Sequence, residues 1–243
     1  MKEEFYTITQ NREIAPGVFR MMLYGDTSPI FSPGQFVNIQ IDGCFLRRPI
    51  SICDWNEHTL TIIYKVVGKG TEILSKEEPG KRLNLLIALG NGFDSSKSGE
   101  TPLLIGGGVG IPPLYGLCRQ LLSEGKKVTV ILGFNRQSEI FYEEEFRGLG
   151  ATVLVTTMDG SAGIKGTVTA AMEGLSYSYF YTCGPMPMFR AIESAAKTGG
   201  QFSFEERMGC GFGACMGCTC QTKNGPKRIC TEGPVLEREE IEW

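Results

Sequence analysis

Five cysteines crowd into the C-terminal part of this 243-residue chain, and their spacing points to metal chemistry. Cys210, Cys215 and Cys218 follow the pattern Cys-x4-Cys-x2-Cys, which is typical of thiolate ligands to a [2Fe–2S] cluster. Three thiolates from one tight loop require backbone freedom, which glycine provides. The loop supplies it at Gly209, Gly211, Gly213 and Gly217. This segment therefore predicts an iron–sulfur site.

A complete cluster needs a fourth thiolate, from either Cys220 or Cys230. Cys220 lies only two residues beyond Cys218, which is cramped for binding a second iron. Cys230 follows an Asn224-Gly225-Pro226 turn that can return the chain to the site, so Cys230 is the expected ligand. Structural zinc is the competing interpretation. Tetrathiolate zinc sites usually use two Cys-x-x-Cys pairs, and only one is evident here.

A second pattern, Leu46-Arg-Arg-Pro-Ile-Ser-Ile52, lies in a strand-like segment. An arginine beside a small hydroxyl residue can pair with a pyrophosphate and hydrogen-bond the edge of a flavin ring. About 20 residues later, Gly68-Lys-Gly-Thr71 opens a short helix, where free N–H groups favour phosphate. A basic edge strand protected against aggregation is the alternative interpretation. The later glycine motif and the nucleotide-type domain that follows favour flavin binding.

A third pattern, Leu103-Leu-Ile-Gly-Gly-Gly-Val-Gly-Ile-Pro-Pro113, has the form of a strand, a glycine-rich turn and a helix start. Such turns bring the backbone close to a dinucleotide pyrophosphate. Tyr181-Thr-Cys-Gly-Pro-Met186 places another strand end and helix start at the same sheet edge. Cys183 is there either as a core thiol or as a residue facing the nicotinamide. The expected nicotinamide-nucleotide contacts are Gly107, Gly108, Gly110, Cys183, Gly184 and Pro185.

The choice between NADH and NADPH stays open in the sequence. The second strand of this region ends in Gly133-Phe-Asn-Arg136, without the acidic residue that usually binds the ribose hydroxyl of NAD.

The first 98 residues have the pattern of an all-β domain. Short runs rich in Val, Ile, Tyr and Phe alternate with turn signals such as Pro33-Gly34 and Pro79-Gly80. Six strands of this kind predict a six-stranded antiparallel barrel, with one helix over Thr71–Lys76. The expected strands are Phe5–Gln10, Val18–Leu23, Phe36–Ile41, Ile50–Asp54, Leu60–Val67 and Arg82–Leu89.

Beyond the polar segment Ser95–Thr101 the pattern changes to strands alternating with helices, which predicts a parallel sheet covered on both faces. We expect domains at residues 1–98, 99–200 and 201–243, the last being a short cysteine-rich segment with a solvated acidic end. The expected strands are Pro102–Ile105, Val128–Leu132, Thr152–Thr156 and Tyr179–Thr182. The expected helices are Pro112–Ser123, Glu143–Leu149, Val168–Glu173 and Met186–Lys197.

Composition narrows the function further. A net charge of −3 offers no basic surface for nucleic acid, and no apolar run approaches the length of a bilayer span. The N-terminus lacks the apolar stretch of a signal peptide, so a cytoplasmic location is expected. The single histidine, His58, lies in a polar turn, which leaves no histidine-based catalytic constellation. Cys44, Cys53 and Cys118 are expected to be core residues.

Three motifs in chain order, Arg-x-x-Ser at 48–51, Gly-x-Gly-x-x-Pro at 108–113 and Cys-Gly-Pro at 183–185, resemble the ferredoxin–NADP reductase superfamily. Within it the chain is most similar to the electron-transfer subunits of type B dihydroorotate dehydrogenases. The residues that carry this similarity are Arg47-Arg-Pro-Ile-Ser51, Leu89-Gly-Asn-Gly-Phe93, Glu206-Arg-Met-Gly-Cys-Gly-x-Gly-x-Cys-x-x-Cys218 and Arg228-Ile-Cys-Thr-Glu-Gly-Pro234.

The resemblance implies a flavin-binding barrel with one FAD, one [2Fe–2S] cluster and NADH as the electron donor. It also implies a separate FMN-containing dihydroorotate dehydrogenase subunit in pyrimidine biosynthesis, in a heterotetramer with two copies of each chain. The alternatives are a subunit of another NAD(P)H-linked oxidoreductase, of the ferredoxin–NADP(H) or sulfide type, and a zinc-stabilised regulatory module. The implied FAD contacts are Arg48, Pro49, Ile50, Ser51, Ile63, Tyr64, Lys65, Gly70 and Thr71.

Overall fold

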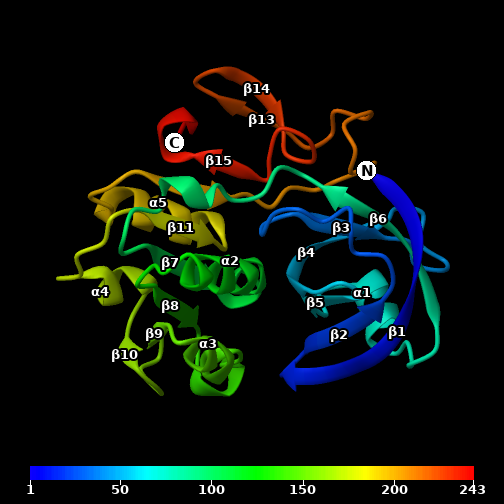
Figure 1. Cartoon of the computed structure of the whole chain (residues 1–243), viewed down its shortest axis with the longest axis horizontal. Coiled ribbons are helices and arrows are strands. Elements are labelled where there is room, and N and C mark those ends of the chain that lie inside the picture. Colours follow the sequence, from blue (N-terminus) through cyan, green and yellow to red (C-terminus); the bar gives the residue numbers. More distant parts are fainter.

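The computed structural model describes all 243 residues, and it divides the chain into two lobes with a third segment above them (Figure 1). The N-terminal lobe is a closed antiparallel barrel with the strand order β1-β2-β5-β4-β3-β6, so the expected six-stranded barrel is confirmed. Its strands are β1 (Lys2–Ala15), β2 (Val18–Tyr24), β3 (Phe36–Ile39), β4 (Arg48–Trp55), β5 (Thr59–Lys65) and β6 (Arg82–Leu89), with helix α1 (Lys69–Ser75) after β5.

The barrel interior is built by alternate side chains of the strands, as the period of two requires. Val37 and Ile39 on β3, for example, are fully buried inside together with Tyr6, Ile62 and other residues of one core cluster. Strand β1 is much longer than predicted, because it pairs with β2 through its second half and with β6 through its first. Register shifts interrupt the β1–β2 ladder and let the long strand bend around the barrel.

The second lobe is a seven-stranded sheet with the order β10-β9-β8-β7-β11-β12-β15, parallel except for its last strand. Two helices pack on each face, and the helices α2 and α3 cover a different core cluster from that under α4 and α5. The expected doubly covered parallel sheet is therefore confirmed. Its elements are β7 (Leu103–Gly107), α2 (Pro112–Ser123), β8 (Thr129–Phe134), α3 (Glu143–Leu149), β9 (Thr152–Thr157), β10 (Ile164–Lys165), α4 (Val168–Met172), β11 (Phe180–Cys183) and α5 (Met186–Ala195).

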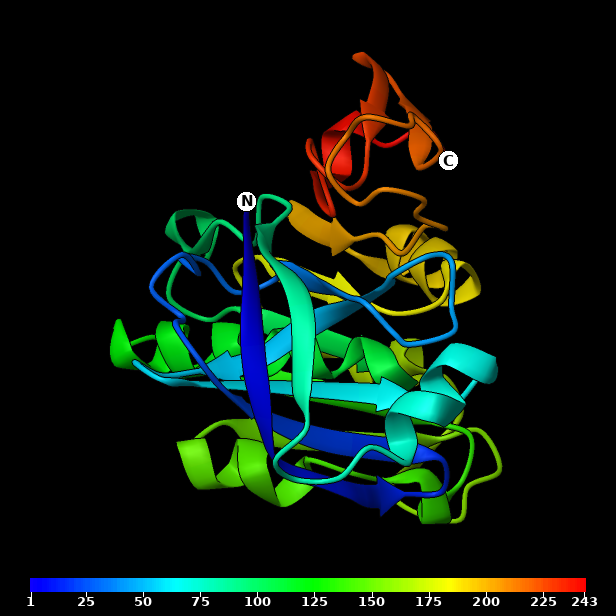
Figure 2. The same cartoon turned by 90° about the vertical axis from the view of Figure 1, so that its right-hand side faces the viewer.

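The C-terminal residues form the cysteine segment, defined here as residues 204–234, between two strands that the sequence did not predict. Strand β12 (Gly200–Ser203) leads into it, and β15 (Val235–Glu237) returns antiparallel to β12 at the edge of the large sheet. Inside the segment, β13 (Thr219–Thr222) and β14 (Gly225–Arg228) form a hairpin. Figure 2 shows this segment standing at the top of the molecule.

The acidic end of the chain is not a solvated tail, which corrects the expectation for residues 237–242. Ile241 is buried, and the Trp243 ring packs edge-on against Phe202 of β12 with ring centroids 4.9 Å apart. Glutamates alternate here with apolar residues that complete the core beneath the sheet edge. Charge alone was therefore a poor guide to exposure.

The two lobes share a core, which fixes their relative position. Helix α2 lies against β4, where Arg119 pairs with Asp54 at 2.7 Å and donates to the carbonyl of Trp55 at 3.0 Å. Cys53 of β4 and Cys118 of α2 are fully buried in this shared core, as expected, and Cys44 is half-buried. No helix of the chain is long and apolar enough to cross a membrane.

Candidate functional site

The flavin motif lies where two neighbouring barrel strands separate. Strand β4 pairs with β5 only through Ile52–Trp55, whereas Arg48–Ser51 pairs with β3 on its other edge. Opposite that free edge, residues 63–65 of β5 pair with β2 alone. Backbone N–H and C=O groups on both strands are thus left without a partner in the ladder. Such an opening suits a planar ring that carries donors and acceptors along its edge.

Arg48 and Gly70 meet at one end of this opening, although they are 22 positions apart in sequence. A Cβ at residue 70 would lie 2.8 Å from Arg48 Cζ, so a larger residue there would displace the guanidinium from its place across the first turn of α1. Thr71 is buried, and its hydroxyl closes the turn by accepting from the Val67 and Gly68 N–H groups. Its side chain is thereby occupied within the turn, and only its backbone remains to bind a ligand.

The three β5 residues of the implied FAD set point in different directions. The Tyr64 side chain lies inside the barrel, where its hydroxyl donates to Asn11 Oδ1 at 3.0 Å. The Ile63 side chain packs in the core shared by the two lobes. Lys65 is exposed and lines the large cavity described next. Ile63 and Tyr64 therefore face the opening between the strands with their backbones only.

A cavity of about 540 Å³ lies at the carboxyl edge of the large sheet, on the side of Lys65. Ligands of parallel α/β sheets bind at this edge. Five of the six residues expected to contact the nicotinamide nucleotide line it: Gly107, Gly108, Gly110, Gly184 and Pro185. Cys183 is not part of the lining. Burial raises the pKa of its thiol to about 12, opposed by a hydrogen bond with Ser203, so the group is a neutral thiol beside the cavity.

The two glycine turns of this cavity touch each other through their backbones. A Cβ at residue 110 would lie 2.5 Å from the Cys183 carbonyl carbon and 2.6 Å from the Gly184 nitrogen. Gly110 has ordinary backbone angles, so its requirement for glycine comes from this close approach and not from a left-handed conformation. The contact brings β7 and β11 together where a dinucleotide would cross between them.

Sequence reasoning missed an acidic residue in the same cavity. Glu139 lies in a short 3-10 turn after β8 and lines the cavity. Its carboxylate accepts from Asn135 Nδ2 at 3.0 Å and pairs with Arg136 Nε at 3.4 Å. An acidic group at the end of the second strand is the usual ribose ligand of NAD sites. The Asn135-x3-Glu139 spacing was a usable signal, because an asparagine can donate a hydrogen bond to a glutamate four residues later in a turn.

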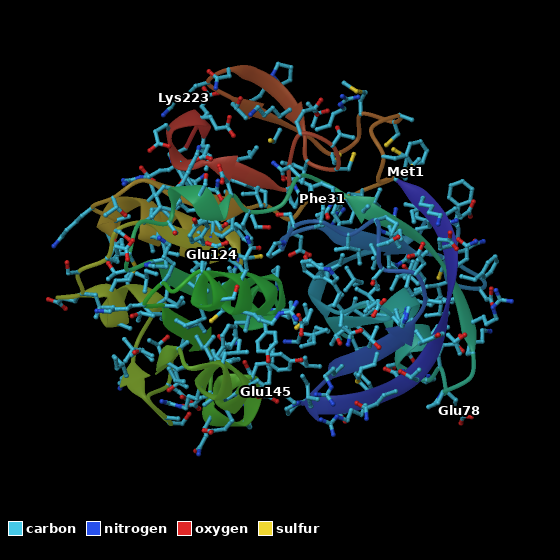
Figure 3. All side chains as sticks on the ribbon, viewed as in Figure 1. Met1, Phe31, Glu78, Glu124, Glu145 and Lys223 are labelled. Atoms are coloured by element: carbon cyan, nitrogen blue, oxygen red, sulfur yellow. The ribbon has the colours of Figure 1, made fainter.

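The cysteine segment gathers its four expected ligands into two pairs. In the outer pair, the Cys215 N–H donates to Cys210 Sγ at 3.4 Å and the Cys210 N–H donates to Cys215 Sγ at 3.5 Å. In the inner pair, the thiols of Cys218 and Cys230 are neighbours, and both residues are buried. Cys220 lies outside both pairs, half-buried on β13. Figure 3 shows sulfur atoms along this orange loop above the barrel.

The electrostatics of the two pairs differ. Burial acts to raise the pKa of Cys210, but N–H groups of Cys215, Phe212 and Ala214 lower it to about 6. Burial and the neighbouring Cys218 raise the pKa of Cys230, because two adjacent buried thiolates would repel each other. Cations bound between the pairs would remove this repulsion and ionise the thiols.

This arrangement fits two metal ions better than one. In a four-cysteine [2Fe–2S] cluster each iron takes two protein thiolates, which matches two pairs. A single tetrahedral zinc would need all four sulfurs around one centre.

Together these features define a class of protein: a flavin- and nicotinamide-dependent reductase module with an added iron–sulfur segment. Two family descriptions match the chain, "Oxidoreductase NAD-binding domain" over residues 104–194 and "Iron-sulfur cluster binding domain of dihydroorotate dehydrogenase B" over residues 205–242. A solved structure described as an NADH-dependent reduced ferredoxin–NADP oxidoreductase of flavin-based electron bifurcation is 30% identical. It covers 98% of this chain and 90% of its own, with a TM-score of 0.88.

Two curated relatives resemble the chain over its whole length. Both are named "Dihydroorotate dehydrogenase B (NAD(+)), electron transfer subunit". The protein from Lysinibacillus sphaericus is 41% identical over 98% of both chains. The protein from Fusobacterium nucleatum is 42% identical over 100% of this chain and 99% of its own. The chain belongs to this family of electron-transfer subunits, and the resemblance inferred from its sequence is confirmed.

Proposed function

We propose that this chain carries electrons from NADH, through FAD and a [2Fe–2S] cluster, to the FMN of a dihydroorotate dehydrogenase catalytic subunit in pyrimidine biosynthesis. The observation that carries the proposal is the order of three sites along one molecule. The nucleotide cavity adjoins the opening between β4 and β5, and the paired cysteines pack over the same barrel. FAD exchanges two electrons as hydride and releases them singly, while a [2Fe–2S] cluster carries one at a time.

The chain's own residues have distinct parts in this scheme. The β4 and β5 backbones and Arg48 would hold FAD, through the set Arg48, Pro49, Ile50, Ser51, Ile63, Tyr64, Lys65, Gly70 and Thr71. Gly107, Gly108, Gly110, Gly184 and Pro185 would position the dinucleotide, with Cys183 behind them. Cys210, Cys215, Cys218 and Cys230 would ligate the two irons. These parts correspond to functional domains at residues 1–98, 99–200 and 201–243.

The outer cysteine pair, with Cys210 half-buried and Cys215 exposed, is the proposed exit for electrons. Cys215 is exposed, and the large apolar side chains of Phe212 and Met216 beside it are 44% and 55% exposed. Apolar groups on a surface mark contact sites when they gather around a functional centre. We propose that the catalytic subunit docks here, in a cytoplasmic heterotetramer with two copies of each chain. Dihydroorotate oxidation itself is expected in the catalytic subunit.

The test uses the full chain purified without air. We expect one FAD and two irons per chain, bleaching of flavin absorbance by NADH, and an EPR signal from the reduced cluster. Dihydroorotate should reduce neither centre unless an FMN-containing catalytic subunit is added. Zinc in place of iron, or oxidation of dihydroorotate by the chain alone, would refute the proposal.

A second function has one specific observation in its favour. The 30% identical solved structure is described as part of an NADH-dependent ferredoxin–NADP oxidoreductase, and it matches the chain almost end to end. The relatives named for dihydroorotate dehydrogenase B are more similar, at 41% and 42% identity, and favour the first function. Co-purification of the native chain distinguishes the two, because each function requires a different partner.

A further inference from the structure

Asn38 is a buried polar residue on the barrel strand next to the flavin motif. It lies on β3, is fully buried, and is directly opposite Pro49 in the β3–β4 ladder. Its neighbours Val37 and Ile39 point into the barrel core, so the Asn38 side chain points to the outer face. The cysteine segment packs over that face, since Phe36 shares a core cluster with Cys218 and Cys230.

The Asn38 carboxamide contacts the first expected cluster ligand. Its Nδ2 donates to the backbone carbonyl of Cys210 at 3.1 Å, and it makes no side-chain hydrogen bond within the barrel. The next residue, Gly211, has φ = +80°. A Cβ at that position would collide with Asn38 Nδ2 and lie 3.3 Å from its Cγ. The loop backbone therefore lies directly on this carboxamide, and glycine at 211 is needed for it.

The oxygen of the same carboxamide is left unused. Asn38 Oδ1 is buried and has no hydrogen-bond partner. A buried polar atom without a partner costs about 1–3 kcal/mol, and an apolar side chain of similar size would avoid that cost. The one hydrogen bond that the Asn38 side chain makes goes to the cysteine segment and not to the barrel.

We propose that Asn38 is a positioning residue for electron transfer between the flavin and the cluster. Its carboxamide fixes the Cys210 end of the cysteine segment against the strand that pairs with the flavin motif. It thereby sets the place and the surroundings of the cluster relative to FAD. This inference rests on the proposed function, because it requires FAD on β4 and a cluster on Cys210. Groups behind metal ligands tune both affinity and potential in this way.

The test compares two variants of nearly equal shape in the full chain purified without air. Asn38→Leu removes the donor, and Asn38→Asp places a second acceptor against the Cys210 carbonyl. We expect FAD content and the rate of flavin bleaching by NADH to stay within about twofold. Loss of the cluster to a chelator should become about tenfold faster in both variants, as is typical when a supporting contact behind a metal ligand is removed. The EPR line shape of the reduced cluster should change, and the Asp variant should have the more negative midpoint potential.

Asn11→Leu is the matched control. Asn11 also donates to backbone carbonyls, those of Leu74 and Glu77 at 3.0 Å each, but it does so at helix α1. We expect this variant to unfold at lower denaturant concentration while its cluster keeps the wild-type EPR spectrum and potential. A general loss of barrel stability is thus distinguished from a change at the cluster.

Wild-type cluster retention, EPR spectrum and potential in both Asn38 variants would overturn the inference. If these variants fail to fold, Gly211→Ala tests the contact from the loop side, where the barrel strand is untouched. It should alter the same three cluster properties, and a wild-type result there would also overturn the inference. A wild-type chain that binds FAD but no iron would instead refute the proposed function, so the two failures are distinguishable.

Discussion

Replacing Gly110 by alanine should separate the two turns that form the nicotinamide end of the cavity. The added Cβ would lie 2.5 Å from the Cys183 carbonyl carbon, whereas ordinary contacts begin at 3.4 Å. Because both sides of the contact are backbone, the turns must move apart by about 0.9 Å. A misplacement of about 1 Å between reacting groups can cost about 100-fold in rate. The expected loss is therefore about 100-fold in kcat/KM for NADH, or about 2.7 kcal/mol.

The assay is anaerobic stopped-flow bleaching of the flavin by NADH. Iron and FAD content should match the wild type, and dithionite should reduce both variants fully, because neither the barrel nor the cysteine segment is altered. Gly148→Ala in helix α3 is the control, since no atom lies within 4 Å of its added Cβ. It should keep the wild-type rate and gain up to about 1 kcal/mol of stability. Reduction of Gly110→Ala by NADH at the wild-type rate would refute the reasoning.

Three further predictions address the cluster, the nucleotide and the sheet edge. Cys230→Ser should lose most of its iron, whereas Cys220→Ser should keep two irons and the wild-type EPR spectrum; the reverse result would reassign the fourth ligand. Glu139→Gln should raise the ratio of the flavin-bleaching rate with NADPH to that with NADH by about tenfold. A charged hydrogen bond to the ribose is worth about 1.5–3 kcal/mol, and removing the carboxylate charge also removes its repulsion of a 2′-phosphate. An unchanged ratio would exclude this role. Glu237 is partly buried, which raises its pKa, but its hydrogen bonds, led by that from Lys97, lower the pKa overall. Ionised Glu237 therefore stabilises the folded chain fully above the ordinary glutamate pKa of 4.5, and this stabilisation is lost as the pH falls. Glu237→Gln should lower the free energy of unfolding by about 1 kcal/mol at pH 7, with the difference shrinking in urea titrations as the pH falls below 4.5; a difference constant with pH would contradict the assignment.

Local patterns were sufficient for most of the fold. Alternation of apolar residues and Pro-Gly turns gave the barrel strands, and short apolar runs followed by helices gave the large sheet. Strands β12 and β15 were missed, because their pairing is between distant residues and neither run is long enough to stand out. The β13–β14 hairpin had a usable signal in Asn224-Gly225, because Gly225 begins β14 with φ = +98° directly after the Lys223-Asn224 turn.

The site was predictable where its residues lie close together in sequence. The residues of the glycine turn at 107–110 and of the Cys-x4-Cys-x2-Cys loop are neighbours in sequence, so a short stretch of sequence was enough to predict each of them. The separation of β4 from β5 depends on barrel closure, and the contact of Asn38 with Cys210 joins residues 172 positions apart. Glu139 was missed because it lies one turn beyond the strand end, where the expected acidic residue was sought. Non-local contacts of this kind leave no pattern in a single sequence.

The attachment of the cysteine segment at both ends has a consequence for how the electron leaves. A redox carrier on a flexible tether can move back and forth between its electron donor and its electron acceptor. Here β12 and β15 anchor the segment to one sheet edge, so the outlet is stationary. In the proposed heterotetramer the catalytic subunit must therefore be held against that outlet, and electron transfer will depend on the distance that this contact sets between the cluster and the acceptor.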